Sequence, residues 1–164
     1  MHPAYLSLGS NIQPETNLPK AVDLLNEYGK IEKVSNVWES EAVGSPGPNF
    51  LNACVLFVTP LLFPELKEQV IHPIEAKLGR IRTADKFAPR TIDIDIIVFD
   101  EQSCNDKFWK QAFVVVPLAE IYPDYQNPLT KESMIETATR LRQSTWMKMR
   151  PEVLSHLTGN DLKA

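Results

Sequence analysis

Apolar residues recur along the chain with two different periods. Short apolar or alternating runs are typical of β-strands, whereas apolar positions three and four residues apart are typical of amphipathic helices. The strands expected on this basis are 4–8, 50–59, 91–100, 113–116 and an exposed, irregular segment at 30–43. The expected helices are 17–28, 64–78 and 131–148, with a short helical turn at 117–121. Strands and helices therefore alternate along most of the chain.

Glycine and proline mark where several of these elements should end or bend. Gly29 follows the first expected helix and is a typical stop signal. Pro73 lies inside the second expected helix, so we expect a kink there or a break at His72. The Gly- and Pro-rich segment 44–49 and the basic segment 79–89 are expected to be loops.

The order strand, helix, strand, strand, helix, strand is typical of a ferredoxin-like βαββαβ core. It predicts an α+β fold with a mainly antiparallel sheet, helices on one face and extra C-terminal elements. We expect a single domain over 1–164, with the core at 1–128 and a helical extension at 129–164.

Composition narrows the class of protein. The chain has 164 residues, 43% of them hydrophobic and 23% charged, which suits one globular domain. A net charge of −4 and a pI near 5.4 argue against a nucleic-acid partner, because such proteins usually carry a basic patch. The sequence has neither an apolar run long enough to span a membrane nor a secretory signal pattern. Cys54 and Cys104 lack the spacing of a zinc site, so we expect reduced thiols in a cytoplasmic protein.

Two carboxylates alternate with isoleucine in the string Ile92-Asp93-Ile94-Asp95-Ile96. Because side chains alternate across a strand, Asp93 and Asp95 should share one face, opposite the apolar core. Paired carboxylates raise each other's pKa unless a cation neutralises them, and Mg²⁺ prefers such oxygen ligands. The pattern predicts a Mg²⁺ site, although a solvated strand face would give the same alternation.

Four basic residues closely precede these carboxylates: Arg80, Arg82, Lys86 and Arg90. Arginine binds phosphate oxygens in a bidentate fashion, and carboxylates hold the metal ions that bridge phosphates. A basic loop leading into an acidic strand therefore predicts a metal–triphosphate site. A surface ion-pair network is the alternative interpretation of the same residues.

An aromatic ring and an amide share one face of the expected strand 50–59. Phe50 and Asn52 lie two positions apart, so they could stack on and hydrogen-bond a flat heterocycle. A core phenylalanine beside a satisfied asparagine would give the same pattern. The string Gly9-Ser10-Asn11 indicates only a turn.

Taken in order, these strings resemble one enzyme family over residues 4–124. They are Tyr5-Leu6-Ser7-Leu8-Gly9-Ser10-Asn11, Phe50-Leu51-Asn52-Ala53, Glu75, Leu78-Gly79-Arg80 and Ala88-Pro89-Arg90-Thr91-Ile92-Asp93-Ile94-Asp95. The chain resembles the 6-hydroxymethyl-7,8-dihydropterin pyrophosphokinases of folate synthesis. The resemblance implies transfer of a diphosphate from ATP to the pterin alcohol, with AMP as the other product.

The resemblance also implies a role for each residue on the nucleotide side. Asp93 and Asp95 would hold two Mg²⁺ ions that bridge the ATP phosphates and the pterin hydroxyl. Arg80 and Arg90 would bind phosphate oxygens, and Glu75 would lie on the nucleotide side. The basic loop residues that help to close over ATP would be Arg82 and Lys86.

On the pterin side, the resemblance places the ring between Phe50 and Phe113. Asn52 and the backbone around Ala42 and Val43 would supply hydrogen bonds. The implied partners are small molecules alone, with no nucleic acid and no membrane, and the chain would be a monomer or a homodimer.

One segment departs from the family pattern. The family usually has a histidine and an arginine before the aromatic residue at position 113, and both face ATP phosphates. Gln111 stands where the arginine would be, and Lys107 or Lys110 could supply a positive charge without the planar fork of arginine. A relative acting on another pterin alcohol, or a weakly active paralogue, therefore stays open. An RNA-binding module of the same strand order is disfavoured by the acidic sheet face.

Overall fold

The computed structural model describes residues 1–42, 46–81, 84 and 89–157. Its centre is a seven-stranded sheet in the order β6-β5-β1-β4-β3-β7, with β2 also pairing with β4. The strands are β1 (His2–Ser10), β2 (Lys30–Val34), β3 (Trp38–Ser40), β4 (Phe50–Thr59), β5 (Asp93–Phe99), β6 (Gln102–Ser103) and β7 (Met147–Met149). Every strand pair is antiparallel.

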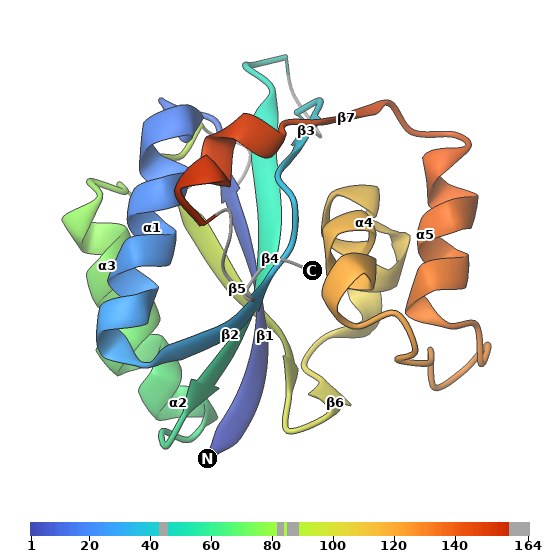
Figure 1. The fold of residues 1–164 in the computed structure, drawn as a ribbon, viewed down its shortest axis with the longest axis horizontal. Helices are drawn as coiled ribbons and strands as arrows, with labels where there is room; N and C mark the ends of the chain where they lie inside the picture. Colours follow the sequence, from blue (N-terminus) through green and yellow to red (C-terminus); the bar gives the residue numbers. More distant parts are fainter. Residues whose placement is uncertain (43–45, 82–83, 85–88, 158–164) are drawn as a thin grey trace.

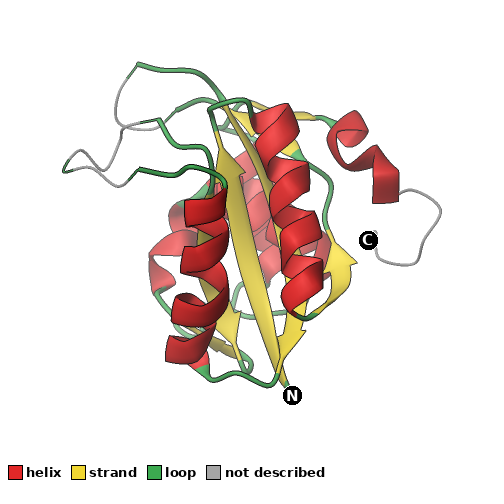
Figure 2. Ribbon diagram, turned by 90° about the vertical axis from the view of Figure 1, so that its left-hand side faces the viewer, coloured by secondary structure: helices red, strands yellow, loops and turns green. Residues whose placement is uncertain are grey.

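Helices cover both faces of this sheet (Figures 1 and 2). The helices are α1 (Pro14–Tyr28), α2 (Phe63–Leu66), α3 (His72–Lys77), α4 (Ala112–Ile121) and α5 (Met134–Arg142). A π-helical turn (Lys67–Ile71) joins α2 to α3, and 3-10 turns lie at Asp106–Lys110 and Pro151–Leu157. The first three helices lie on one face, and α4 and α5 lie on the other.

The central strand β1 pairs with two partners that are distant in sequence. Ser10 pairs with Leu51 of β4, and Ala4 pairs with Phe99 of β5. If β2 and β3 count as one interrupted strand beside β4, the inner strands have the predicted ferredoxin-like arrangement. The predicted α+β fold with a mainly antiparallel sheet is confirmed, and α4 and α5 add a layer on the opposite face.

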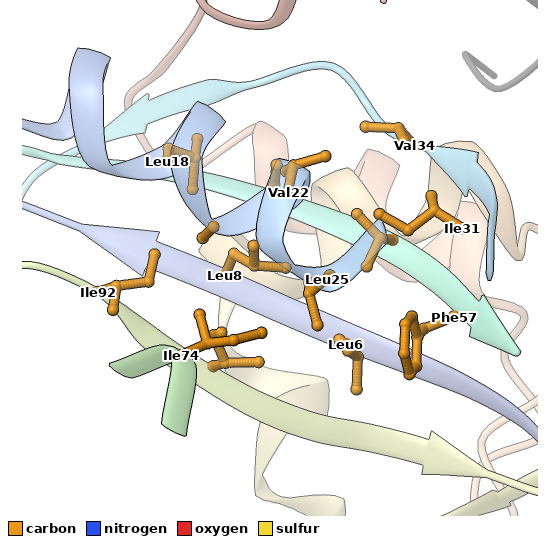
Figure 3. Packing of buried hydrophobic residues seen from close by; sticks show 14 of the residues in the cluster. Leu6, Leu8, Leu18, Val22, Leu25, Ile31, Val34, Phe57, Ile74 and Ile92 are labelled. Atoms are coloured by element: carbon orange, nitrogen blue, oxygen red, sulfur yellow. The ribbon is translucent and has the colours of Figure 1, made fainter. Parts of the chain in front are cut away.

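The face under α1 and α3 is a continuous apolar core. Leu6 and Leu8 of β1, Phe57 of β4, and Leu18 and Leu25 of α1 are fully or almost fully buried there (Figure 3). These β1 residues alternate with more polar ones on the other face, as the period of a strand requires. The α1 residues recur at helical spacing, which matches the prediction for 17–28. Burial of this apolar surface is the main source of the fold's stability.

The prediction of a strand at 113–116 is wrong, because these residues belong to α4 together with the expected turn at 117–121. Three consecutive valines favour a strand by intrinsic preference. Here they pack between the sheet and α5, and nearly every residue of α4 is buried. Tertiary burial therefore outweighs the intrinsic preference of the valines for a strand.

Pro73 disturbs its helix as predicted. The π-helical turn ends where α3 begins at His72, and the His72 amide donates to the carbonyl oxygen of Lys67. A proline ring clashes with the carbonyl four residues earlier, and a widened turn relieves such a clash. The helical segment is thus divided at His72, with the π-helical turn before it.

Two further expectations need correction. The segment 30–43 forms β2 and β3 with a break between them, but its apolar residues Ile31, Val34 and Trp38 are buried and not exposed. The helix expected over 131–148 ends at Arg142, and the chain then forms β7 against β3. Pairing of Met147 with Ser40 fixes this strand, and such a long-range contact leaves no local pattern in the sequence. Within the described residues, no helix is long and apolar enough to cross a membrane.

Candidate active site

The second face of the sheet is only partly covered, and its open end forms a pocket of about 660 Å³. Residues on this face of β1, β3, β4 and β5 form the floor. The walls are the N-terminal end of α4, at 111–114, and the segment 144–146 that precedes β7. Strand alternation therefore gives the same strands an apolar core on one face and a functional surface on the other.

Pairing brings three strands to one level at the centre of the floor. Gly9 of β1 is opposite Asp93 of β5 and Asn52 of β4, and Ser7 is opposite Asp95. A Cβ atom at Gly9 would lie 2.9 Å from Asn52 Oδ1, closer than such atoms normally approach. A glycine is required here so that the Asn52 side chain can lie across β1.

Asp93 and Asp95 share the pocket face, as predicted. The pKa of Asp95 is raised to about 7 because protein atoms desolvate its carboxyl, and the charges of Asp93 and Glu75 add to this effect. Asp95 is nevertheless exposed at the open pocket, so solvent moderates this rise. A cation beside Asp95 would therefore stabilise its charged form.

Arginine side chains fix Asp93 from two sides. Arg80 Nη1 lies 2.8 Å from one carboxylate oxygen, and Arg90 Nη1 lies 3.2 Å from the other. Arg90 lines the pocket, whereas Arg80 is not among the described residues that line it. Both arginines were expected to bind phosphate, but only Arg90 lies where it could contact a ligand in the pocket.

Glu75 lies behind the site, buried beneath β5. Its Oε2 atom accepts hydrogen bonds from Arg80 Nη1 at 2.6 Å and from the Ile94 amide at 3.0 Å. The Glu75 carboxylate therefore fixes Arg80 and the backbone between the two aspartates. Among the described residues, it is not part of the lining of either pocket, so its expected nucleotide contact has no support from its position.

Asn11 is a site residue whose role the sequence analysis missed. Its Oδ1 atom accepts a hydrogen bond from the backbone N–H of Arg90 at 2.8 Å, and the backbone N–H of Asn11 donates to the Arg90 carbonyl oxygen at 3.1 Å. This pair of bonds holds the chain just before Asp93. The string Gly9-Ser10-Asn11 is the available signal: by composition it indicates only a turn, and its place among the strings that resemble the family gives Asn11 no role.

Four of the residues expected at the pterin lie together in the pocket lining: Ala42, Phe50, Asn52 and Phe113. Asn52 is buried, and its Nδ2 atom donates to Ser40 Oγ at 2.8 Å. This bond orients the amide, and Phe113 stands in the first turn of α4 at the pocket wall. Val43, the fifth expected residue, lies outside the described residues.

An adjoining pocket of about 420 Å³ shares Asp95, Ile97 and Gln111 with the first. Lys67 and Lys107 line this second pocket, whereas Lys110 lines the first. Asp95 and Gln111 therefore separate two compartments, and each compartment has at least one exposed lysine. The expected loop residues Arg82 and Lys86 lie outside the described residues.

The residues present fit a magnesium ion. In the described part of the chain, no group of three His, Cys, Asp or Glu side chains converges on one point. Two adjacent carboxylates are nevertheless what Mg²⁺ needs from a protein, because it keeps several waters and takes further oxygens from substrate phosphates. The pKa of Asp95 is raised chiefly by desolvation, so its charged form is disfavoured as long as no cation lies beside it.

The chain is similar to known proteins of one family. The family model for 7,8-dihydro-6-hydroxymethylpterin-pyrophosphokinase (HPPK) matches residues 5–123. The 2-amino-4-hydroxy-6-hydroxymethyldihydropteridine pyrophosphokinase of Synechocystis sp. is 36% identical over 82% of this chain and 74% of its own length. The enzyme of the same name from Aquifex aeolicus is 36% identical over 83% of this chain and 90% of its own length.

Solved structures agree on the fold. An HPPK-DHPS crystallised in complex with substrates matches 87% of this chain with a TM-score of 0.67 at 14% identity. Wild-type HPPK-DHPS of Plasmodium falciparum with SDX-DHP matches 85% with a TM-score of 0.64 at 14% identity. This chain spans 44% and 43% of those longer chains. From its family match and its curated relatives, the chain belongs to the 7,8-dihydro-6-hydroxymethylpterin-pyrophosphokinase family.

Proposed function

We propose that this chain transfers the β- and γ-phosphates of ATP, as a diphosphate, to the hydroxyl of 6-hydroxymethyl-7,8-dihydropterin. Its family makes it an ATP-dependent pterin pyrophosphokinase of folate biosynthesis. One observation carries the assignment to this site: a single pocket holds the Asp93–Asp95 pair and, across the same strands, the Phe50–Asn52 pair. The first pair suits a metal–phosphate group, and the second suits a flat heterocycle.

The pterin would bind against the β4 end of the floor. Phe50 and Phe113 offer aromatic faces, and Asn52 offers an amide that is already oriented by Ser40. An amide can both donate to and accept from the edge of a pterin. Backbone at Ala42 would complete this edge contact. Such a site selects a planar ring that has alternating donors and acceptors.

The triphosphate would lie over β5, where Arg90 faces the pocket beside the carboxylates. Asp93 and Asp95 would hold Mg²⁺, and the family resemblance implies two such ions. The metal would neutralise triphosphate charge and favour ionisation of the pterin hydroxyl. Arg80 acts from behind, because its bonds to Glu75 and Asp93 keep the Asp93 carboxylate in place. These residues position the reacting groups without entering the chemistry as acids or bases.

The reaction is an in-line displacement at the β-phosphorus. The pterin oxygen forms a new bond to that phosphorus, the bond to the AMP oxygen breaks, and the hydroxyl proton leaves to solvent. Among the described residues that line the two pockets there is no histidine, so we assign no side-chain base. Catalysis would rest on positioning and on stabilisation of phosphate charge.

The missing histidine and arginine of the family would be replaced by lysines. Lys110 lines the first pocket, and Lys67 and Lys107 line the second, so positive charge is present on both sides of Gln111. A lysine binds phosphate as a point charge, with less geometric specificity than an arginine fork. We therefore propose that the chain binds ATP with altered phosphate contacts. We also propose that its substrates are small molecules and that it works in the cytoplasm as a monomer or a homodimer.

Conversion of ATP in the presence of a panel of pterin alcohols tests this function. We expect AMP as the nucleotide product, together with a pterin diphosphate, and the highest kcat/KM for 6-hydroxymethyl-7,8-dihydropterin. Release of ADP would contradict diphosphate transfer. A clear preference for another pterin alcohol would favour the alternative of a relative with a different substrate, which the altered segment before Phe113 supports.

A further inference from the structure

The C-terminal segment reaches the substrate pocket although it lies beyond the family match, which ends at residue 123. Ser144, Thr145 and Trp146 line the pocket, as do residues 111–114 at the start of α4. They occupy the connection that runs from α5 to β7, which crosses from the outer helix to the edge of the sheet (Figure 1). The pocket is therefore built from both the family core and the segment that follows it.

This segment is held in place from both sides. β7 pairs with β3 so that Met147 is opposite Ser40, which puts Trp146 beside the start of the Glu41–Ala42 segment. Met147 is buried in the core between the sheet and α4. The Arg150 side chain then forms an ion pair with Glu39 at 2.8 Å. The segment that contains Trp146 is thus fixed to the sheet by strand pairing, burial and an ion pair.

Trp146 differs from the other two tryptophans in its exposure. Its exposed fraction is 50%, compared with 9% for Trp38 and 5% for Trp109. A large apolar ring with half of its surface in water gains free energy when a ligand covers it. Its place in the lining means that a ligand in the pocket would cover it.

We propose that Trp146 is a further substrate-binding residue, whose indole forms the third aromatic wall of the pterin pocket, with Phe50 and Phe113 as the others. The inference rests on the proposed function, since it concerns the same pterin. Indole is a strong stacking partner for flat heterocycles, and Ser144 and Thr145 line the same pocket. The C-terminal segment would then contribute to pterin affinity while leaving the nucleotide side unchanged.

Direct pterin binding tests the inference. Dissociation constants for 6-hydroxymethylpterin would be measured by calorimetry with Mg²⁺ and α,β-methylene-ATP, whose methylene bridge blocks transfer. We expect Trp146→Ala to weaken pterin binding about tenfold, the range of base–aromatic stacking, and Trp146→Phe to restore most of it. Affinity for the ATP analogue alone should stay within about twofold of the parent.

Leu129→Ala is the matched control. Leu129 belongs to the same C-terminal segment, is 86% exposed and is not among the residues lining either pocket. Its truncation should leave pterin binding unchanged. Thermal unfolding of Leu129→Ala and Trp146→Phe should match the parent closely, and Trp146→Ala should lower the midpoint only slightly, because half of the indole is already in water.

Tryptophan fluorescence gives a second readout. Because Trp38 and Trp109 are buried, acrylamide should shorten mainly the lifetime of Trp146 in the free protein. Bound pterin should remove most of that quenching in the parent, and the Trp146→Phe variant should have little to remove. Lifetimes are preferred to intensities because the pterin absorbs light.

The failures are distinguishable. A parent that binds and converts the pterin, together with an equally tight Trp146→Ala variant or unchanged acrylamide access, overturns the inference alone. A parent that neither binds the pterin alcohol nor forms AMP overturns the proposed function, and the inference with it.

Discussion

The two faces of the sheet have opposite tasks. On the face under α1, residues such as Leu6, Leu8 and Phe57 form a closed apolar core. On the other face, the neighbouring Ser7 and Gly9 form the floor of an open pocket. The register of one strand thus places stabilising and functional side chains one residue apart.

The effect of a substitution in a strand therefore depends more on which face of the sheet the side chain occupies than on where the residue lies along the strand. Core-face side chains are surrounded by protein, so their loss leaves cavities. Pocket-face side chains are exposed to a ligand, and their loss should change binding or catalysis while the fold survives. Pairs of substitutions at adjacent residues of one strand can separate the two effects.

The largest effect should come from the core face. Leu6→Ala removes a fully buried side chain, so we expect a loss of about 2–5 kcal/mol in the free energy of unfolding. Urea denaturation measures it. Ser7→Ala, one residue later on the pocket face, is the matched control and should cost about 1 kcal/mol. Equal losses at both positions would break the comparison between the faces.

The next effect should be catalytic. Asp95→Ala removes a proposed metal ligand, so we expect turnover at saturating Mg²⁺ to fall roughly 10²–10³-fold. The free energy of unfolding should stay equal or rise, because repulsion from Asp93 is relieved. Glu101→Gln, at an exposed carboxylate outside the pocket, should keep parent activity. Near-normal turnover in Asp95→Ala would refute the metal assignment.

Phe113→Ala should discriminate between the two substrates. Loss of one stacking face should weaken pterin binding by about 1–3 kcal/mol and leave ATP binding nearly unchanged. Calorimetric titration of each ligand measures both. Equal losses for pterin and ATP would mean that Phe113 is only a packing residue of α4.

Positive charge near Gln111 should have a smaller effect. Lys110→Ala should lower ATP affinity about tenfold if this lysine contacts a phosphate, since a charge-assisted bond contributes about 1.5–3 kcal/mol where geometry permits. Gln111→Arg should then add little, because the lysine already occupies that place. Dissociation constants for ATP, measured for both variants and the parent at one salt and Mg²⁺ concentration, test this expectation. A gain with Gln111→Arg and no loss with Lys110→Ala would indicate a phosphate contact that this chain lacks.

The smallest effect should appear in the pH dependence of metal-free protein. The folded chain holds the Asp95 proton more tightly than the unfolded chain, because the folded-state pKa is raised to about 7. Stability should therefore fall as pH rises from about 4 to 7, and Asp95→Asn should remove that part of the slope. Partial exposure of the side chain keeps the effect small. Thermal unfolding across this pH range, with chelator present, measures it; equal slopes in the two proteins would contradict the assigned proton.

The sequence specified the core elements because their signals are local. Alternation placed Asp93 and Asp95 on one face, and the spacing of apolar residues located α1. The apolar pattern wrongly predicted a strand at 113–116, which is helical, because burial between two layers outweighs the strand preference of valine. It also missed β7, since the pairing of Met147 with Ser40 joins segments more than 100 residues apart.

The sequence predicted part of the candidate site, as it predicted part of the fold. Residues in strings that resemble the family came together in the pocket, including Asn52 and Arg90. Glu75 did not, because its carboxylate is used by Arg80 and the Ile94 amide behind the pocket. Trp146 had no signal in sequence, because its position depends on how the chain leaves α5 and reaches the edge of the sheet.

The central position of β1 has a consequence for how the chain is made. Ala4 finds its partner Phe99 only after the intervening residues have been translated, which takes roughly 5–20 s at about 5–20 residues per second. Until β4 and β5 leave the ribosome, an apolar strand waits with both hydrogen-bonding edges unsatisfied, and such edges pair readily with other chains. Yield of soluble protein in cells should therefore depend on chaperones that shield nascent chains.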